Sequence, residues 1–258
     1  IETIFSLTVA QWFYWTLINL IIILILVWRW LVLTKGFKLK LNLINLLLLR
    51  QAGQSISFIT PGPQFGGEPL QIFLLWKKYF ISPGDSVLAV AADRAFELWT
   101  NFAVLLIGII ILFFTQTELA NWVSIATLVS SLILILSLSI WFLINQSEKI
   151  ETNINKLVQK WLVSKRLSEI NFHSNNFTAS LKTLLTNKVA LIFALLLSIS
   201  GWFLTFFELY LVLNFFSINL DLSQFVLLMV AMRLAFLLPL PGGIGTLEAS
   251  VIWSFSAL

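Results

Sequence analysis

Cysteine is absent from the 258 residues, and histidine occurs once, at His173. Without cysteine the chain has no disulfide, no thiol nucleophile and no cysteine metal site. The single histidine lies in the polar segment NFHSNN, which is typical of a solvated loop. The sequence also has no histidine or cysteine cluster for a transition metal and no GxxxxGK[ST] loop for a nucleotide phosphate. It therefore predicts neither a metal nor a cofactor.

Charged residues are scarce as well. They make up 11% of the chain, against roughly 25% in an ordinary soluble domain. Apolar residues make up 59%, and the mean hydropathy is +0.95. Several windows exceed the roughly 18 apolar residues that mark a membrane-spanning helix. The expected fold class is an all-α polytopic membrane protein.

Apolar runs predict the helices. They are expected at about 8–33, 41–59, 69–76, 86–114, 121–145, 189–216 and 222–237. Residues 146–187 are rich in Asn and Lys and contain no spanning window. Their apolar residues recur at helical spacing, which fits either an amphipathic helix on the membrane face or a solvated linker helix.

Lysine and arginine predict the orientation. The basic flanks are 34–40, 77–78 and 146–188, and the last carries seven Lys or Arg against three Glu. The flanks without Lys or Arg are 1–7, 115–120 and 217–221. We expect the basic flanks in the cytoplasm and the others outside, in a multi-pass protein of the plasma membrane.

Two Pro/Gly-rich segments interrupt this apolar chain. PGPQFGGE spans 61–68 and PGGIGTLE spans 241–248, and each reads Pro-Gly, five residues, Glu. Proline removes a backbone donor and glycine permits unusual conformations, so such a segment must be buried in protein or line a wet cavity. A kinked helix with glycines for close packing is the alternative. The predicted hairpin tips are Pro61, Gly62, Gly66, Gly67, Pro241, Gly242, Gly243 and Gly245.

The two breaks suggest an inverted repeat. Each follows two helices and precedes another, and the predicted orientation runs the two units through the membrane in opposite senses. We expect one transmembrane domain over 1–258. It would contain repeat 1 at about 8–80, connecting helices at 86–145, the cytoplasmic segment 146–187, and a truncated repeat 2 at about 189–258.

Charged residues inside apolar helices are candidate site residues, because they usually face a cavity or a partner. The candidates are Arg50, Glu68, Asp93, Arg94, Glu97, Arg233 and Glu248, and Glu208 is a further intramembrane charge. In a structural role, Arg50 and Arg94 neutralise Glu68, Asp93 or Glu97. Arg233 then pairs with Glu248. In a functional role, the arginines and the restarting helices attract a phosphate headgroup. Both roles remain open from the residues.

Four segments resemble the lysylphosphatidylglycerol synthase transmembrane family, which includes flippase-like (UPF0104) proteins. They are WRWLVL at 28–33, TPGPQFGGEPLQIFLL at 60–75, AADRAFELW at 91–99 and LPLPGGIGTLEASV at 238–251. The matching site positions are Pro61, Gly67, Glu68, Asp93, Arg94, Pro241, Gly242, Gly243, Gly245 and Glu248. Many relatives have a basic residue where this chain has Gln71, which shifts the expected headgroup contact to Arg94 and Arg233.

The resemblance implies a lipid flippase or lipid transporter for an anionic or glycosylated lipid, without enzymatic activity. Glu68 and Glu248 are then candidate proton-binding groups. Two alternatives remain: a membrane-embedded transferase with Glu68 or Asp93 as general base, and a non-catalytic partner of a lipid-modifying complex. The expected partners are the lipid substrate and the bilayer, with a homo-oligomer or a lipid-modifying enzyme as further candidates and no nucleic acid.

Overall fold

The computed structural model describes residues 7–60, 66–115, 133, 137, 175–236, 240 and 243–256. Those residues form eight helices and no strand. The helices are α2 (Val9–Gly36), α3 (Leu43–Ile59), α4 (Glu68–Tyr79), α5 (Pro83–Thr115), α8 (Asn175–Thr186), α9 (Lys188–Phe215), α10 (Leu222–Phe236) and α11 (Thr246–Ser256). The helix predicted at 121–145 and most of the segment 146–187 lie outside the described residues.

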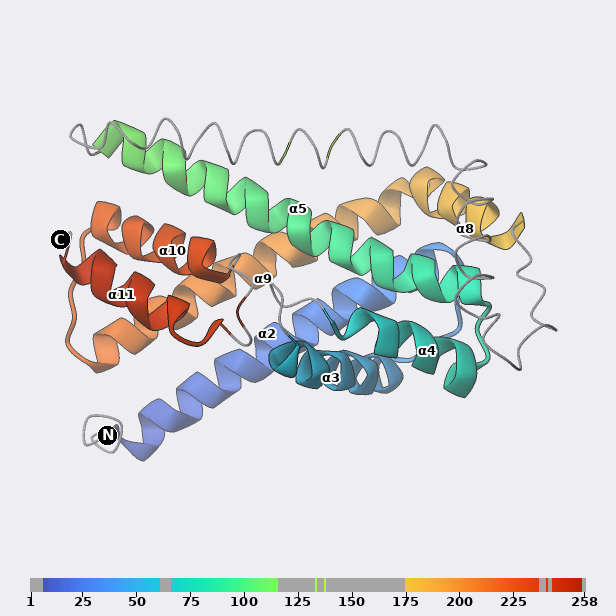
Figure 1. Cartoon of the computed structure of the whole chain (residues 1–258), viewed down its shortest axis with the longest axis horizontal. Coiled ribbons are helices and arrows are strands. Elements are labelled where there is room, and N and C mark those ends of the chain that lie inside the picture. Colours follow the sequence, from blue (N-terminus) through green and yellow to red (C-terminus); the bar gives the residue numbers. More distant parts are fainter. Residues whose placement is uncertain are drawn as a thin grey trace.

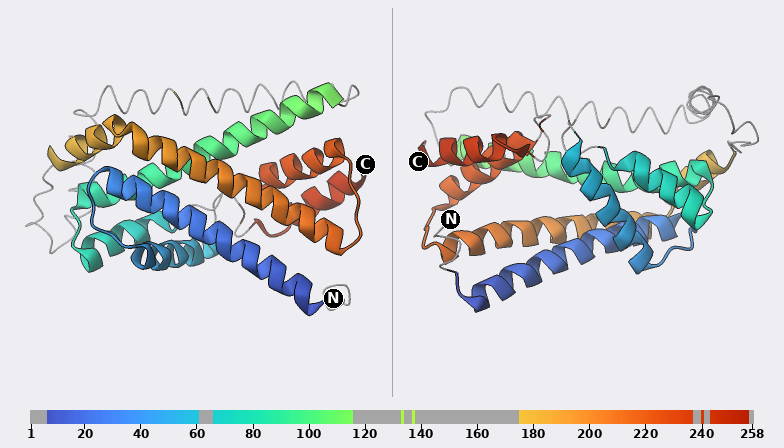
Figure 2. Two further views of the ribbon diagram at one scale, coloured as in Figure 1. Left: turned by 180° about the vertical axis from the view of Figure 1, so that it is seen from behind. Right: turned by 60° about the horizontal axis from the view of Figure 1, so that its bottom comes forward.

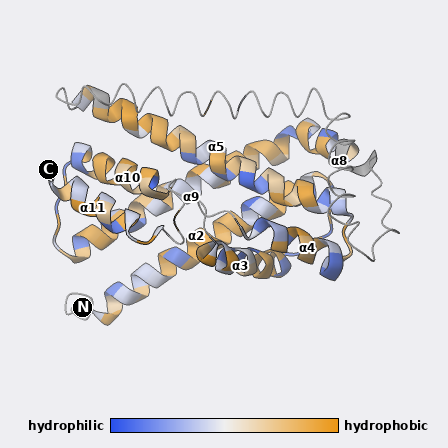
Figure 3. Cartoon of the chain, viewed as in Figure 1, coloured by the Kyte–Doolittle hydropathy of each residue, from blue (hydrophilic) through white to orange (hydrophobic). Residues whose placement is uncertain are grey.

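Three helices are long and apolar enough to span a membrane: Val9–Gly36, Pro83–Leu112 and Lys188–Phe215. The first and third have 28 residues each, or about 42 Å at 1.5 Å per residue, which exceeds the roughly 30 Å hydrocarbon core. Figure 3 shows long hydrophobic stretches on α5, α9 and α10. The chain is therefore a multi-pass membrane protein, as its composition predicts.

Polar side chains begin these helices. The Thr8 hydroxyl accepts from the backbone N–H of Gln11, whose side chain returns to the Thr8 backbone, so α2 starts with a capping box. Asn42 and Asn187 cap α3 and α9 by accepting backbone N–H groups three residues further on. The apolar runs thus have defined starts, which is why their predicted bounds agree closely with the structure.

Helix α2 packs mainly against α9, and the two run in opposite directions (Figure 1, Figure 2). Helices α3 and α4 lie toward the end at which α2 finishes, whereas α10 and α11 lie toward the end at which α9 finishes. The end of α3 and the start of α4 are directed toward the middle of the molecule, as are the end of α10 and the start of α11. Helix α5 contacts both α4 and α10.

Glycine permits the close approach of α3 and α4. A Cβ on Gly67 would overlap the backbone of Gly53, and a Cβ on Gly53 would overlap Gln71. Across the same contact, the Gly67 N–H donates to the Ser57 hydroxyl over 3.0 Å. In the second break, Gly243 and Gly245 have φ values of +70° and +84°, a region that favours glycine. Pro61, Gly62, Pro241 and Gly242 lie outside the described residues.

Two apolar cores hold the helices together. The larger one contains side chains of α2, α3, α4, α5, α8 and α9, among them the fully buried Trp30, Leu46 and Leu75. Trp30 also donates its indole N–H to the Ala89 carbonyl of α5 over 2.8 Å. The smaller core joins α5 to α10 through Leu105, Leu227 and neighbouring residues. Both cores include α5, which brings its charged residues against the other helices.

Candidate functional site

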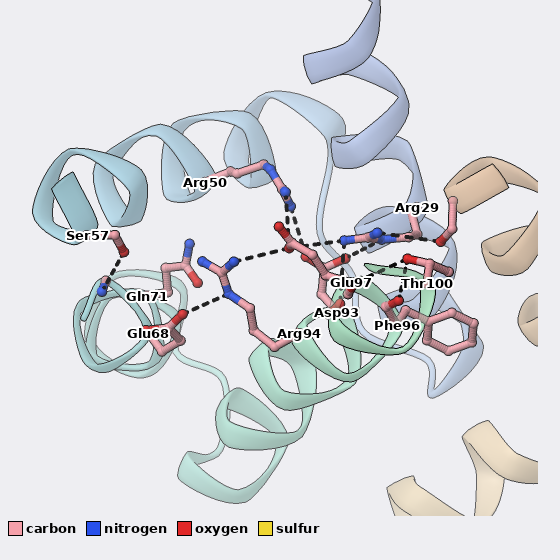
Figure 4. Close-up of polar contacts among 12 residues, drawn as sticks. Arg29, Arg50, Ser57, Glu68, Gln71, Asp93, Arg94, Phe96, Glu97 and Thr100 are labelled. Carbon is pink, nitrogen blue, oxygen red and sulfur yellow. Dashed lines mark hydrogen bonds and ion pairs between the residues drawn. The ribbon is translucent and has the colours of Figure 1, made fainter. Parts of the chain in front are cut away.

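Six charged side chains from four helices meet within the larger core; we call them the charge network (Figure 4). They are Arg29 of α2, Arg50 of α3, Glu68 of α4, and Asp93, Arg94 and Glu97 of α5. The three α5 residues share one helical face because they are three and four positions apart. Sequence spacing predicts that shared face, and folding supplies the partners.

Asp93 lies at the centre of the charge network and is only 4% exposed. Its Oδ1 accepts from Arg29 Nε over 2.8 Å, and its Oδ2 accepts from Arg50 Nη1 over 2.9 Å. Each carboxylate oxygen therefore has its own arginine. A buried charge is tolerated only when it is paired in this way.

Glu97 and Glu68 form the more open edge of the charge network. Glu97 Oε2 lies 3.4 Å from both Arg29 and Arg50 and 3.1 Å from Arg94. The Arg94 Nε lies 2.8 Å from Glu68 Oε1, so Arg94 bridges α5 to the start of α4. The Glu97 side chain keeps 30% of its accessible surface, against 6% for Asp93.

The charge network is electrically neutral, since three arginines face three carboxylates. Arg29 and Arg50 are 1% and 5% exposed, and each contacts both Asp93 and Glu97. A phosphate group could reach Arg29 or Arg50 only by displacing a carboxylate. Their geometry therefore supports a structural role, which ties α2 and α3 to α5.

The glutamates of the two breaks occupy matching positions. Glu68 Oε2 accepts from the Gly66 N–H, and Glu248 Oε2 accepts from the Gly245 N–H, each over 2.7 Å. A carboxylate there satisfies free backbone N–H groups and favours the positive end of the helix dipole. Both glutamates thus stabilise the restart of a helix after its break.

Arg233 lies in the last turn of α10, eight residues before Pro241, where the second break begins. It forms no ion pair with any described residue, and Glu248 in particular is not its partner. The guanidinium carbon instead lies 4.5 Å from the ring centre of Trp202 on α9 and 5.8 Å from that of Phe236. Aromatic faces stabilise a cation without neutralising it. Among the described residues, the Arg233 guanidinium therefore has aromatic neighbours and no carboxylate within ion-pair distance.

Residues 2–258 match the family described as "Lysylphosphatidylglycerol synthase TM region". The chain belongs to this family. A UPF0104 membrane protein of Methanothermobacter thermautotrophicus is 24% identical over 253 residues, which covers 93% of this chain and 73% of that relative. No solved structure matches the chain. Membership of the lysylphosphatidylglycerol synthase transmembrane family points to a lipid-related membrane function.

Of the sequence-predicted site residues, this family member brings together Arg50, Glu68, Asp93, Arg94 and Glu97, while Arg233 and Glu248 lie apart from the network. Arg29 was missed by sequence reasoning, although a single arginine in a long apolar helix is a detectable signal. Gln71 is 4% exposed and donates to the Leu49 carbonyl, so it joins α4 to α3. No three His, Cys, Asp or Glu side chains within the described ranges are arranged to hold a metal ion.

Proposed function

We propose that this protein moves a lipid with an anionic or glycosylated headgroup between membrane leaflets. The observation that carries the proposal is the pair of matched breaks, in which Glu68 and Glu248 each accept a glycine N–H over 2.7 Å where a helix restarts. Such interruptions avoid lipid and mark substrate sites in transporters. The family description, which refers to a lipid synthase, supports a lipid as the class of substrate.

We propose further that the two halves form an inverted repeat with two re-entrant hairpins. Support comes from the order of the elements, since α2, α3 and α4 correspond to α9, α10 and α11. Both α2 and α9 have 28 residues, and they pack together in opposite directions. The broken ends of both hairpins are directed toward the middle of the molecule. In the plasma membrane, this arrangement would give one hairpin access from each side.

Arg233 is the proposed headgroup contact. It is a guanidinium without an ion pair among the described residues, it keeps part of its surface accessible, and it lies in the last turn of the helix that precedes the second break. A guanidinium can donate two parallel hydrogen bonds to a phosphate. The Trp202 ring holds the side chain in place while leaving its charge available to an anion.

Transport is proposed in preference to enzymatic transfer because the candidate general bases are engaged. Asp93 accepts from two arginines, and Glu68 accepts from a backbone N–H and lies against Arg94. A general base must be within hydrogen-bond reach of the substrate proton, and each of these carboxylates already holds donors of the protein. Neither carboxylate is placed as a free base in the described structure.

The proposal is tested by reconstituting the purified chain into vesicles and measuring how fast fluorescent lipids become accessible from the outer leaflet. The lipids compared would be phosphatidylglycerol, phosphatidylcholine and an uncharged glycolipid. We expect protein-dependent movement of at least one of them. If Arg233 holds a phosphate, Arg233→Gln lowers the rate of phosphatidylglycerol movement by at least about tenfold, since hydrogen bonds to charged groups contribute about 1.5–3 kcal/mol.

The matched control is Lys188→Gln, which removes the same charge from the exposed start of α9. Lys188 is far from Arg233 along the helix bundle, so its loss should leave the rate unchanged. Movement that is equal in empty and protein-containing vesicles for all three lipids would refute the proposed function. Movement that Arg233→Gln leaves intact would refute only the headgroup contact.

A further inference from the structure

The lysines of the described residues gather at one end of the molecule, where α2 and α4 finish, α8 lies and α9 begins (Figure 1). All are exposed, and none forms an ion pair with a described residue. They are Lys35, Lys38, Lys40, Lys77, Lys78, Lys182 and Lys188. Among the described carboxylates, Asp85 alone lies at this end, and its two oxygens accept from the Ser180 and Ser82 hydroxyls over 2.6 and 2.8 Å. This end therefore carries an excess of accessible positive charge.

Two of these lysines lie beside an exposed aromatic ring. Lys77 and Lys78 are in the last turn of α4, and Phe80, the residue that ends this helix, is 90% exposed. The φ of Phe80 is +55°, a left-handed conformation that suits glycine at the end of a helix and that a bulky residue rarely adopts. Packing within the protein does not account for a phenylalanine here, because almost all of its surface is uncovered.

Neighbouring rings hold the two lysines without neutralising them. The Lys77 ammonium lies 3.8 Å from the centre of the Trp76 ring, and the Lys78 ammonium lies 5.7 Å from that of Tyr79. An aromatic face attracts a cation but carries no net charge. Both ammonium groups are therefore positioned at the end of α4 and remain available to an anion.

The length of α4 fits a position of these residues at the membrane surface. The helix begins at Glu68, beside the tip of the first proposed hairpin, and Lys77 and Lys78 follow nine and ten residues later. That separation is about 14–15 Å along a helix, or half of the roughly 30 Å hydrocarbon core. With the hairpin tip near the middle of the membrane, the lysines reach the lipid headgroups. An aromatic ring beside them suits the boundary between headgroups and acyl chains.

We propose that Lys77, Lys78 and Phe80 bind an anionic phospholipid of the leaflet at this end; we call these residues the lipid anchor. The inference rests on the proposed function for the position of α4 in the membrane, and it adds the charge of the lipid that gathers beside the first hairpin. The ammonium groups contact the phosphate, and the Phe80 ring packs against the acyl chains. A lysine near the membrane surface favours an anionic lipid by about fivefold. A lipid whose phosphate is balanced by choline is held less.

The absence of cysteine makes a local measurement possible, because Phe73→Cys introduces a single site for a fluorophore. Phe73 is 52% exposed and lies on α4 one turn before Lys77. The labelled full chain would be reconstituted into phosphatidylcholine vesicles with a small fraction of phosphatidylglycerol or phosphatidylcholine that carries a quenching spin label on an acyl chain. At low salt, phosphatidylglycerol should quench at least about fivefold more effectively than phosphatidylcholine. High salt should reduce this preference, because it screens exposed charges.

Three variants of the labelled chain separate the parts of the lipid anchor. Lys77→Gln combined with Lys78→Gln should abolish the preference for phosphatidylglycerol. Lys182→Gln combined with Lys188→Gln is the matched control, which removes the same charge from the same end and should keep the preference. Phe80→Gly should weaken quenching by phosphatidylglycerol without lowering the unfolding temperature, because glycine adopts a positive φ readily.

Equal quenching by the two lipids in the chain with both lysines would overturn the inference, as would a preference that survives the loss of both. Undiminished quenching in Phe80→Gly would overturn the contact between the Phe80 ring and the lipid. If the double lysine variant fails to fold, the salt dependence of the unaltered anchor still decides the question. The proposed function fails separately, if the chain prefers phosphatidylglycerol in this measurement but moves no lipid between leaflets.

Discussion

Replacing Asp93 by asparagine tests the charge network most directly. Asparagine has nearly the same shape, so the change removes a charge and little volume. Asp93 is 4% exposed and supplies the shortest ion-pair contacts of Arg29 and Arg50, of 2.8 and 2.9 Å. After the change, Arg29 and Arg50 share the single carboxylate of Glu97 at 3.4 Å. One buried positive charge is then uncompensated.

Removing one partner of a buried ion pair costs about 3–5 kcal/mol. For a chain of this size, 1 kcal/mol corresponds to roughly 2–4 °C in the unfolding temperature. Asp93→Asn should therefore lower that temperature by about 6–20 °C. Glu97→Gln should cost less, because it removes longer contacts and leaves Asp93 in place between Arg29 and Arg50.

The assay is thermal unfolding in detergent, followed by tryptophan fluorescence and by loss of the monodisperse peak in size-exclusion chromatography. Both variants and wild type would be heated at one rate, because membrane proteins often unfold irreversibly. The reasoning is refuted if Asp93→Asn unfolds within 2 °C of wild type, or if Glu97→Gln is the less stable variant. Either result would mean that the buried arginines do not depend on Asp93.

Two further changes test local geometry. Gly67→Ala should lower the unfolding temperature, because the new Cβ overlaps the Gly53 backbone. The control is Gly201→Ala, whose Cβ meets Leu26 and Ile25 at ordinary contact distance and should be tolerated. Equal stability of the two variants would show that α3 and α4 can separate without cost. At the start of α10, the backbone N–H of Gln224 holds the pKa of Asp221 below its ordinary value of 3.8. Asp221→Ala should therefore lose a stabilisation that wild type has above about pH 4 and loses as the pH falls further, so that unfolding curves of the two proteins converge in acid.

Much of the helical pattern could be predicted from the sequence, because apolar runs are bounded by polar capping residues. The run expected at 189–216 is the helix Lys188–Phe215, capped by Asn187. Agreement is poorer beside α4, which continues three residues past Trp76. There Lys77 and Lys78 lie over the rings of Trp76 and Tyr79, and these contacts accommodate two charged residues in the last turn of the helix. Cation–aromatic contacts of this kind do not appear in a hydropathy profile.

The candidate site was only partly predictable. The spacing of Asp93, Arg94 and Glu97 places them on one face, but their partners come from helices whose docking a single sequence does not specify. Arg29 was missed because it stands close to Lys35 and resembles an end-of-helix charge, although it is 1% exposed. The expected pairing of Arg233 with Glu248 is absent because each has a nearer alternative, Trp202 for the cation and the Gly245 N–H for the anion.

The positions of the network residues along the chain also bear on biosynthesis. All six lie between residues 29 and 97, so every ion pair of the network can form once α2 to α5 have been made. A nascent chain of that length can therefore reside in the membrane without an exposed unpaired arginine. The contact of Trp15 and Asn19 with Glu208 cannot form until α9 has been synthesised. The N-terminal half of α2 can therefore pack against α9 only after most of the chain has been synthesised.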